Sequence, residues 1–228
     1  MNNHLCQNQF SSSMKQHRLI LILVFTLLAS SVLSGRTFEL TDENCVRIAV
    51  IASDAPRLSW AGLHGQSGYT TNVLALYNTD SRKTAFLIAF PLDHIPDDKR
   101  ITSATLSMYC VLWGQDKPRV EVRRIIGDWG DGVCHLYRRT HPEKVKWTKP
   151  GATGIGTDRA RRATGLVQLS EELGEFSLNV TEDVELWYWR GVPNNGWIVT
   201  LETKGEARFY SPTHEPGTWK LDVTYEPR

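Results

Sequence analysis

An excess of charge of either sign is absent from this sequence of 228 residues, in which 26 lysines and arginines stand against 25 aspartates and glutamates. A nucleic-acid surface that covers a whole protein requires a clear basic excess. We therefore expect no nucleic-acid partner.

The sequence also lacks the short motifs of several enzyme classes. It contains no nucleophile elbow, no zinc-protease helix and no phosphate-binding loop, and we find no internal repeat or coiled-coil pattern. Carboxylate pairs occur at Glu171-Glu172 and Glu182-Asp183, but the spatial separation that glycosidase chemistry needs cannot be derived from sequence. Catalysis is therefore the least favoured interpretation, and no catalytic residue is assigned.

Long hydrophobic runs are absent apart from one at residues 19–28. Basic residues precede it, and small residues follow, with a signal-peptidase pattern at 32–34. The run is too short to span a membrane. We predict a signal peptide at residues 1–34, a mature single domain at 36–228, and a secreted or cell-surface location without a membrane span after cleavage. Whether translation starts at the first residue or at Met14 stays open.

Cysteine is scarce, with four in the whole chain. Signal cleavage removes Cys6 and leaves Cys45, Cys110 and Cys134. An oxidising destination permits a disulfide, but the number is odd and spacing cannot identify a pair. Three buried thiols are an equally good interpretation.

Short alternating segments dominate the mature chain. Residues 102–113 place Ala104, Leu106, Met108, Cys110 and Leu112 on one face, which we expect in the core, and more polar residues on the other. Residues 119–126 alternate in the same way, so that Val120 and Val122 point inward and Arg119, Glu121 and Arg123 point outward. Turn-forming residues separate the segments. Many short strands with few helical patterns predict an all-β sandwich.

One short helix is predicted near residues 182–190. Thr181 suits an N-cap whose hydroxyl accepts from a first-turn amide, and Glu182 and Asp183 follow it where the helix dipole favours anions. Val184, Trp187 and Tyr188 share a face that must pack against the sandwich, and Gly191 is placed to end the helix in a left-handed conformation.

Residues 127–165 show little periodicity, and such a long irregular segment is usually functional or disordered. Within it, the basic tracts at 138–139 and 158–162 are more typical of a solvated loop than of a binding site. Asp128 and Asp131 lie in a glycine-rich loop and give a weak indication of structural calcium.

Cys134 and His135 with His141 do not match zinc-ligand spacing. We therefore predict no cofactor, and leave metal binding open.

A series of motifs in fixed order resembles a known family. The motifs are TSATLSMY at 102–109, DWGDG at 128–132, VKWTKPGATG at 145–154, LNVTEDVELWYWRGVPNNGW at 178–197, RFYSPTHE at 208–215 and WKLDVTYEP at 219–227. Together they resemble the DNRLRE domain, also called the disaggregatase-related domain, some members of which are classed as carbohydrate-binding modules of family ninety-six. The resemblance implies a secreted jelly-roll β-sandwich that binds polysaccharide, with anionic polysaccharides such as alginate among the ligands.

Sugar binding requires an apolar platform and surrounding polar groups, and an acidic sugar adds a need for arginine. Tyr109 and Trp113 share one strand face, and Arg119 and Arg123 share the corresponding face of the next strand. If these strands pair as a hairpin, the four side chains form one surface, which Trp147 could extend. The alternative is that both aromatic residues pack under the long loop and the arginines are solvated.

Three hypotheses follow. We favour a secreted, non-catalytic domain that binds an acidic polysaccharide. The second hypothesis is a structural or adhesion domain whose partner is the cell envelope or a separate protein, such as an enzyme. The third is a polysaccharide lyase or hydrolase.

Overall fold

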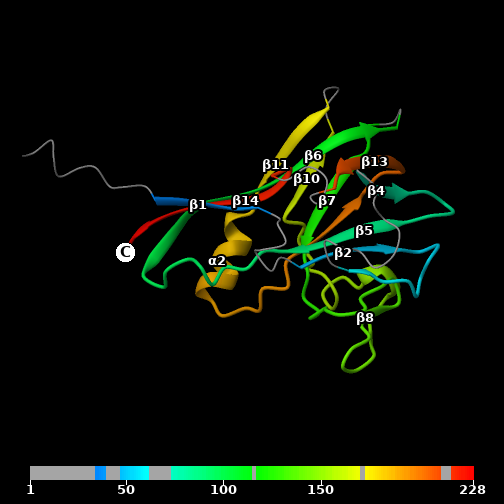
Figure 1. Cartoon of the computed structure of the whole chain (residues 1–228), viewed down its shortest axis with the longest axis horizontal. Coiled ribbons are helices and arrows are strands. Elements are labelled where there is room, and N and C mark those ends of the chain that lie inside the picture. Colours follow the sequence, from blue (N-terminus) through cyan, green and yellow to red (C-terminus); the bar gives the residue numbers. More distant parts are fainter. Residues whose placement is uncertain (1–33, 40–46, 62–72, 115–116, 170–172, 212–216) are drawn as a thin grey trace, which may run out of the picture. The chain divides into compact units, whose positions relative to one another are not determined.

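Antiparallel strands make up most of the chain in the computed structural model, which describes residues 34–39, 47–61, 73–114, 117–169, 173–211 and 217–228 (Figure 1). The strands are β1 (Ser34–Glu39), β2 (Arg47–Ala52), β3 (Trp60–Ala61), β4 (Val73–Asn78), β5 (Thr84–Ala89), β6 (Lys99–Trp113), β7 (Arg119–Arg124), β8 (Tyr137–Arg139), β9 (Val145–Lys146), β10 (Gly165–Gln168), β11 (Gly174–Asn179), β12 (Trp197–Leu201), β13 (Gly205–Tyr210) and β14 (Trp219–Pro227). The helices are the short 3₁₀ turn η2 (Pro150–Ala152) and α2 (Thr181–Trp189).

The strands form two principal sheets. Sheet A has the order β1-β14-β6-β13-β4, with β11 also paired to β6, and sheet B has the order β10-β7-β12-β5-β2-β3. Consecutive strands from β4 to β7, and from β10 to β13, alternate between the sheets, as in a jelly roll. The predicted all-β sandwich is confirmed.

The inner faces of both sheets enclose the main hydrophobic core. Sheet A contributes alternate residues of β6, including Ala104, Leu106 and Met108, as predicted. Phe86 of β5 contacts both Phe209 and Trp219, at ring-centroid distances of 5.7 and 5.3 Å. Aromatic pairs at these separations stabilise a core beyond the area that they bury.

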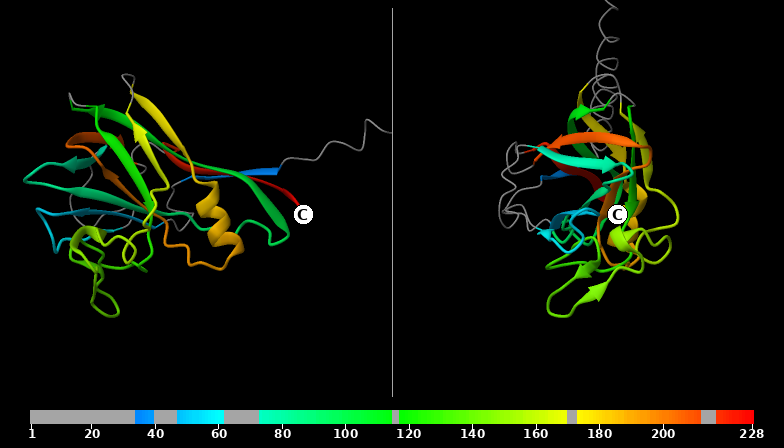
Figure 2. Two further views of the ribbon diagram at one scale, coloured as in Figure 1. Left: turned by 180° about the vertical axis from the view of Figure 1, so that it is seen from behind. Right: turned by 90° about the vertical axis from the view of Figure 1, so that its right-hand side faces the viewer.

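Part of the outer face of sheet B, on β2, β5 and β12, is apolar as well. Residues 125–164, which we call the excursion, cover part of that face (Figures 1 and 2). Their apolar side chains form a second core with it. Trp129 and Trp147 are buried there, and their indole N–H groups donate to the carbonyl oxygens of Asn195 (2.8 Å) and Cys134 (2.9 Å). The excursion, predicted to be functional or disordered, is therefore an ordered layer.

A β-bulge in β6 changes which side chains face the core. The strand pairs Cys110 with Phe209 of β13 but Leu112 with Arg208, so that Val111 is the additional residue. One extra residue reverses the alternation beyond it. Trp113 therefore packs against the main core, whereas Leu112, which was predicted to be in the core, is exposed.

The predicted helix is present as α2 and lies beside β6 (Figure 2). Gly191 follows it with φ of 62°, as predicted. The predicted capping role of Thr181 was wrong, because its hydroxyl accepts a hydrogen bond from the amide of Ala104 on β6 (2.9 Å). The side-chain oxygen of Asn179 instead accepts from the amide of Thr181 (3.0 Å).

Asp183 in the first turn of α2 joins the helix to sheet B. Its carboxylate accepts hydrogen bonds from the indole N–H of Trp197 (2.8 Å) and the hydroxyl of Thr164 (2.5 Å), and it pairs with Arg124 (3.2 Å). Three partners on three segments fix the position of the helix more firmly than an exposed carboxylate at a helix terminus could.

Cys110 and Cys134 are buried free thiols, and Cys45 lies outside the described residues. Burial raises the pKa of the Cys110 thiol to about 11. Residues 1–33 also lie outside the described part, so the signal peptide stays a prediction. In the part that is described, no helix has the length and apolar character needed to cross a membrane.

Truncation of Trp187 tests the docking of α2. Trp187 is buried and contacts Trp197 edge to face at 4.6 Å, so we expect Trp187→Ala to lower the free energy of unfolding by about 3–5 kcal/mol. Denaturant titration followed by circular dichroism measures the loss. Trp189→Ala is the control, because Trp189 is only half-buried against Tyr188 and Arg228. Equal losses in the two variants would contradict the proposed packing.

Candidate functional site

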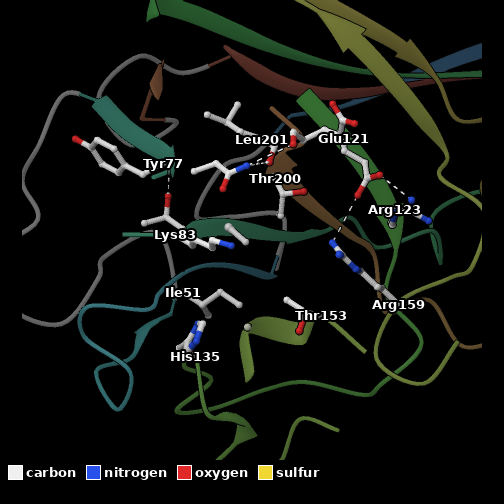
Figure 3. A pocket seen from close by; sticks show the side chains of 15 residues that line it. Ile51, Tyr77, Lys83, Glu121, Arg123, His135, Thr153, Arg159, Thr200 and Leu201 are labelled. Carbon is white, nitrogen blue, oxygen red and sulfur yellow. Dashed lines mark hydrogen bonds and ion pairs between the residues drawn. The ribbon is translucent and has the colours of Figure 1, made fainter. Parts of the chain in front are cut away.

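A groove lies on the outer face of sheet B, beside the area that the excursion covers (Figure 3). Its volume is about 350 Å³, within the usual range of ligand sites. Four strands supply its floor through Ile51 of β2, Ala85 of β5, Thr200 of β12 and Glu121 of β7. The floor thus runs from apolar at β2 to charged at β7.

Glu121 is the charged centre of the groove. It is 8% exposed, and Arg123 donates to one of its carboxylate oxygens at 2.7 Å. The other carboxylate oxygen lies 3.6 Å from Arg159 of the excursion, which is an ion pair but too long for a hydrogen bond. Figure 3 shows both guanidinium groups converging on Glu121. Two arginines therefore share one carboxylate.

The two arginines differ in their surroundings. The hydrogen bond that Arg123 donates to Glu121 raises the pKa of Arg123, and the carbonyl groups of Ala160 and Arg161 also accept from Arg123, at 3.2 and 2.6 Å. Burial lowers the pKa of Arg159, with Glu121 opposing that effect. The positive charge of Arg159 is therefore less fully balanced by its neighbours than that of Arg123.

The backbone of the excursion places Arg159 through its neighbour Asp158. The buried carboxylate of Asp158 accepts hydrogen bonds from the amides of Thr148 (2.8 Å), Lys149 (2.9 Å) and Gly154 (3.0 Å). These three bonds tie the chain on both sides of η2 to one side chain, so Arg159 starts from a fixed backbone position.

His135, Gly151 and Thr153 line the groove from the excursion side, and Lys83 lines it from the β5 side. Gly151 has φ of 75°, and a Cβ atom there would lie 2.8 Å from the His135 ring, so glycine is required. Burial lowers the pKa of His135. The imidazole therefore favours its neutral form.

The predicted hairpin of residues 102–113 and 119–126 was wrong. β6 belongs to sheet A and β7 to sheet B, so the chain between them changes layer. Tyr109 therefore lies on the outer face of sheet A, where it stacks with Tyr210 at 5.3 Å, whereas Arg119 and Arg123 lie on the outer face of sheet B.

The sequence-predicted site residues are thus only partly brought together. Arg123 lines the groove, and Arg119 flanks it in an ion pair with Glu202 (2.7 Å). Trp113 faces the main core because of the bulge, and Trp147 is buried in the second core. Neither tryptophan can present its ring as a platform in this arrangement.

Sequence reasoning missed Glu121 and Lys83 as groove residues, and it treated the tract at 158–162 as a solvated loop. Arg161 and Arg162 of that tract are exposed, but Arg159 is mostly buried in the groove. Glu121 could have been identified as a groove residue from the sequence, because the alternation of β7 places it on the same face as Arg123.

Asp128, one of the two aspartates that suggested a calcium site, already has charged partners. Asp128 pairs with Arg139 (2.6 Å) and lies 3.8 Å from Arg47. Among the described residues, no three His, Cys, Asp or Glu side chains gather in an arrangement that could hold a metal ion. The calcium hypothesis gains no geometric support from this loop.

No known protein-family model matches the chain, and comparison with curated proteins finds no match. The resemblance to the DNRLRE domain therefore stays a prediction.

Removal of the Glu121 charge tests the ion-pair cluster. Glu121→Gln leaves two mostly buried guanidinium groups without a carboxylate, and we expect a loss of about 3 kcal/mol in the free energy of unfolding. Glu202→Gln breaks a more exposed pair with Arg119 and should cost at most about 1 kcal/mol. Denaturant titration compares the two variants, and similar small losses would show that Glu121 is effectively solvated.

His135 should make stability depend on pH. Because burial lowers its folded-state pKa, the unfolded chain binds the proton more readily, and the free energy of unfolding falls as pH drops from above about 6.5 through the folded pKa. We expect the stability difference between wild type and His135→Gln to shrink over this window in denaturant titrations. His141→Gln, which changes an exposed histidine of the excursion, should follow the wild-type curve. A constant difference between wild type and His135→Gln would refute the assignment.

Proposed function

We propose that this protein is a secreted, non-catalytic domain that binds an acidic polysaccharide in the groove on sheet B. The observation that carries the proposal is the pair of guanidinium groups on the single carboxylate of Glu121, beside an open cavity. An anionic ligand would provide the second carboxylate that this cluster lacks.

Charge along the groove favours an anion. Lys83, Arg123 and Arg159 line it, against Glu121 and Glu202. Arg159 does not hydrogen-bond to Glu121 at 3.6 Å, so a sugar carboxylate near it can accept a charge-assisted bond. Guanidinium groups suit planar carboxylates because their donors match the two oxygens.

The groove also contains hydroxyl groups and apolar surface, which a sugar can use in addition to the charged groups that would hold any anion. Thr153 and Thr200 bring hydroxyls to the groove, and Ile51 and Ala85 bring apolar surface. A pyranose ring has both hydroxyl edges and an apolar C–H face, so it can use both kinds of surface. The sequence resemblance to polysaccharide-binding DNRLRE domains and the predicted signal peptide support the same function.

The two carboxylates that line the groove favour binding over catalysis. Glu121 pairs with Arg123 and Glu202 pairs with Arg119, each at 2.7 Å. A carboxylate engaged in this way is poorly available as a general acid or base. A lyase or hydrolase would have to break one of these pairs first.

Neutralisation of Arg159 tests the proposal. We expect wild-type protein to bind alginate or polygalacturonate and not a neutral glucan. Arg159→Gln should weaken binding about tenfold or more, because a hydrogen bond to a charged group contributes about 1.5–3 kcal/mol. Isothermal titration measures the affinity. Arg162→Gln is the matched control, since Arg162 lies in the same excursion but is 84% exposed.

A second variant separates lost binding from lost folding. Lys83 is exposed and lines the groove, so Lys83→Gln should weaken binding at low ionic strength without a change in unfolding midpoint. Failure of both acidic polymers to bind wild-type protein would overturn the proposal.

A further inference from the structure

We propose that the groove holds its polysaccharide as an extended chain that crosses the strands of sheet B, and that Leu166 of β10 forms an additional sugar subsite next to Glu121. This inference rests on the proposed function and specifies how the ligand lies.

Strand register aligns five side chains in one row on the outer face of sheet B. Glu121 pairs with Leu166 of β10 on one side and Thr200 of β12 on the other. The pairing Val199–Phe86 places Thr200 opposite Ala85, and Ala85 pairs with Ile51 of β2. Side chains of directly paired residues lie on the same face. The row Leu166–Glu121–Thr200–Ala85–Ile51 therefore runs straight across the strands.

The length of this row suits a short stretch of polysaccharide. Neighbouring strands lie about 4.8 Å apart, so five aligned residues span about 19 Å. A pyranose residue in an extended chain is about as long as one strand spacing. Ile51 and Ala85 are only 1% and 4% exposed, so a chain that follows the row places sugars over β12, β7 and β10 and ends against this apolar end of the groove.

Four of the five residues line the cavity, and Leu166 continues the row beyond it. Leu166 is 51% exposed and lies on β10, which is the edge strand of sheet B among the described residues. Its neighbour Gly165 faces the other way, since a Cβ there would lie 2.2 Å from Leu178. Leu166 thus offers apolar surface next to the charged centre.

The charged centre at Glu121 and the apolar side chain of Leu166 would make different contacts with the polysaccharide. Arg123 and Arg159 gather around Glu121 and would hold a carboxylate. Leu166 on the next strand can contact the C–H face of the adjoining sugar. A disaccharide can occupy the charged centre alone, whereas a longer chain also reaches Leu166.

A length series of ligands tests the inference. The probes are uronate oligomers of two, four and six residues, prepared from alginate and from polygalacturonate, titrated into the whole protein by calorimetry. We expect affinity to rise from two to four residues and then level off. Leu166→Ala should weaken binding of the longer oligomers about three- to tenfold and leave disaccharide binding unchanged.

Leu112→Ala is the matched control, because Leu112 is 45% exposed on the outer face of sheet A. It should bind every oligomer as wild type does. If Leu166→Ala binds long oligomers as well as wild type does, the added subsite is refuted while the proposed function stands. If affinity does not depend on oligomer length, the extended path is refuted in the same way. If no oligomer binds wild-type protein, the proposed function and this inference both fail.

Discussion

The burial of Trp129 and Trp147 against the outer face of sheet B is the constraint on which the rest of the structure depends. Both indole N–H groups donate to backbone carbonyls in the second core, so each ring is fixed in orientation as well as depth. This core holds the excursion on an apolar sheet face that would otherwise be exposed. Because the excursion covers only part of that face, the groove exists at its border, and Arg159 reaches β7 from the covering layer.

A border between a buried and an open sheet face is a suitable place for charge. Glu121 is too buried to be solvated freely, and one carboxylate removed from water requires a partner. Arg123 comes from the same strand, two residues away, whereas Arg159 comes from the excursion. The cluster therefore assembles only when the excursion is in place, and the site and the second core depend on each other.

Sequence patterns predicted the structure correctly where a side chain's position depends only on its near neighbours in the chain. Alternation placed Val120 and Val122 in the core and Arg123 outside, and Gly191 ended the helix as its position indicated. The failures came from non-local events. The additional residue at Val111 changed the side on which Trp113 lies, although nothing in the local sequence marks it. The separation of β6 and β7 into different sheets likewise depends on which distant strands each one pairs with.

Under the proposed function, the arrangement around Glu121 would also limit how strongly an acidic sugar binds. With one arginine, the carboxylate would neutralise the only cation, and a second anion would meet no net attraction. With two, one positive charge remains, but an incoming carboxylate still lies near the negative charge of Glu121. The net electrostatic attraction is the difference between the attraction of the incoming carboxylate to the arginines and its repulsion from Glu121. Salt screens this attraction where the groove is open to solvent. Under the proposed function, a single sugar would therefore bind weakly at this centre, and useful affinity would have to come from several sugars along the polysaccharide.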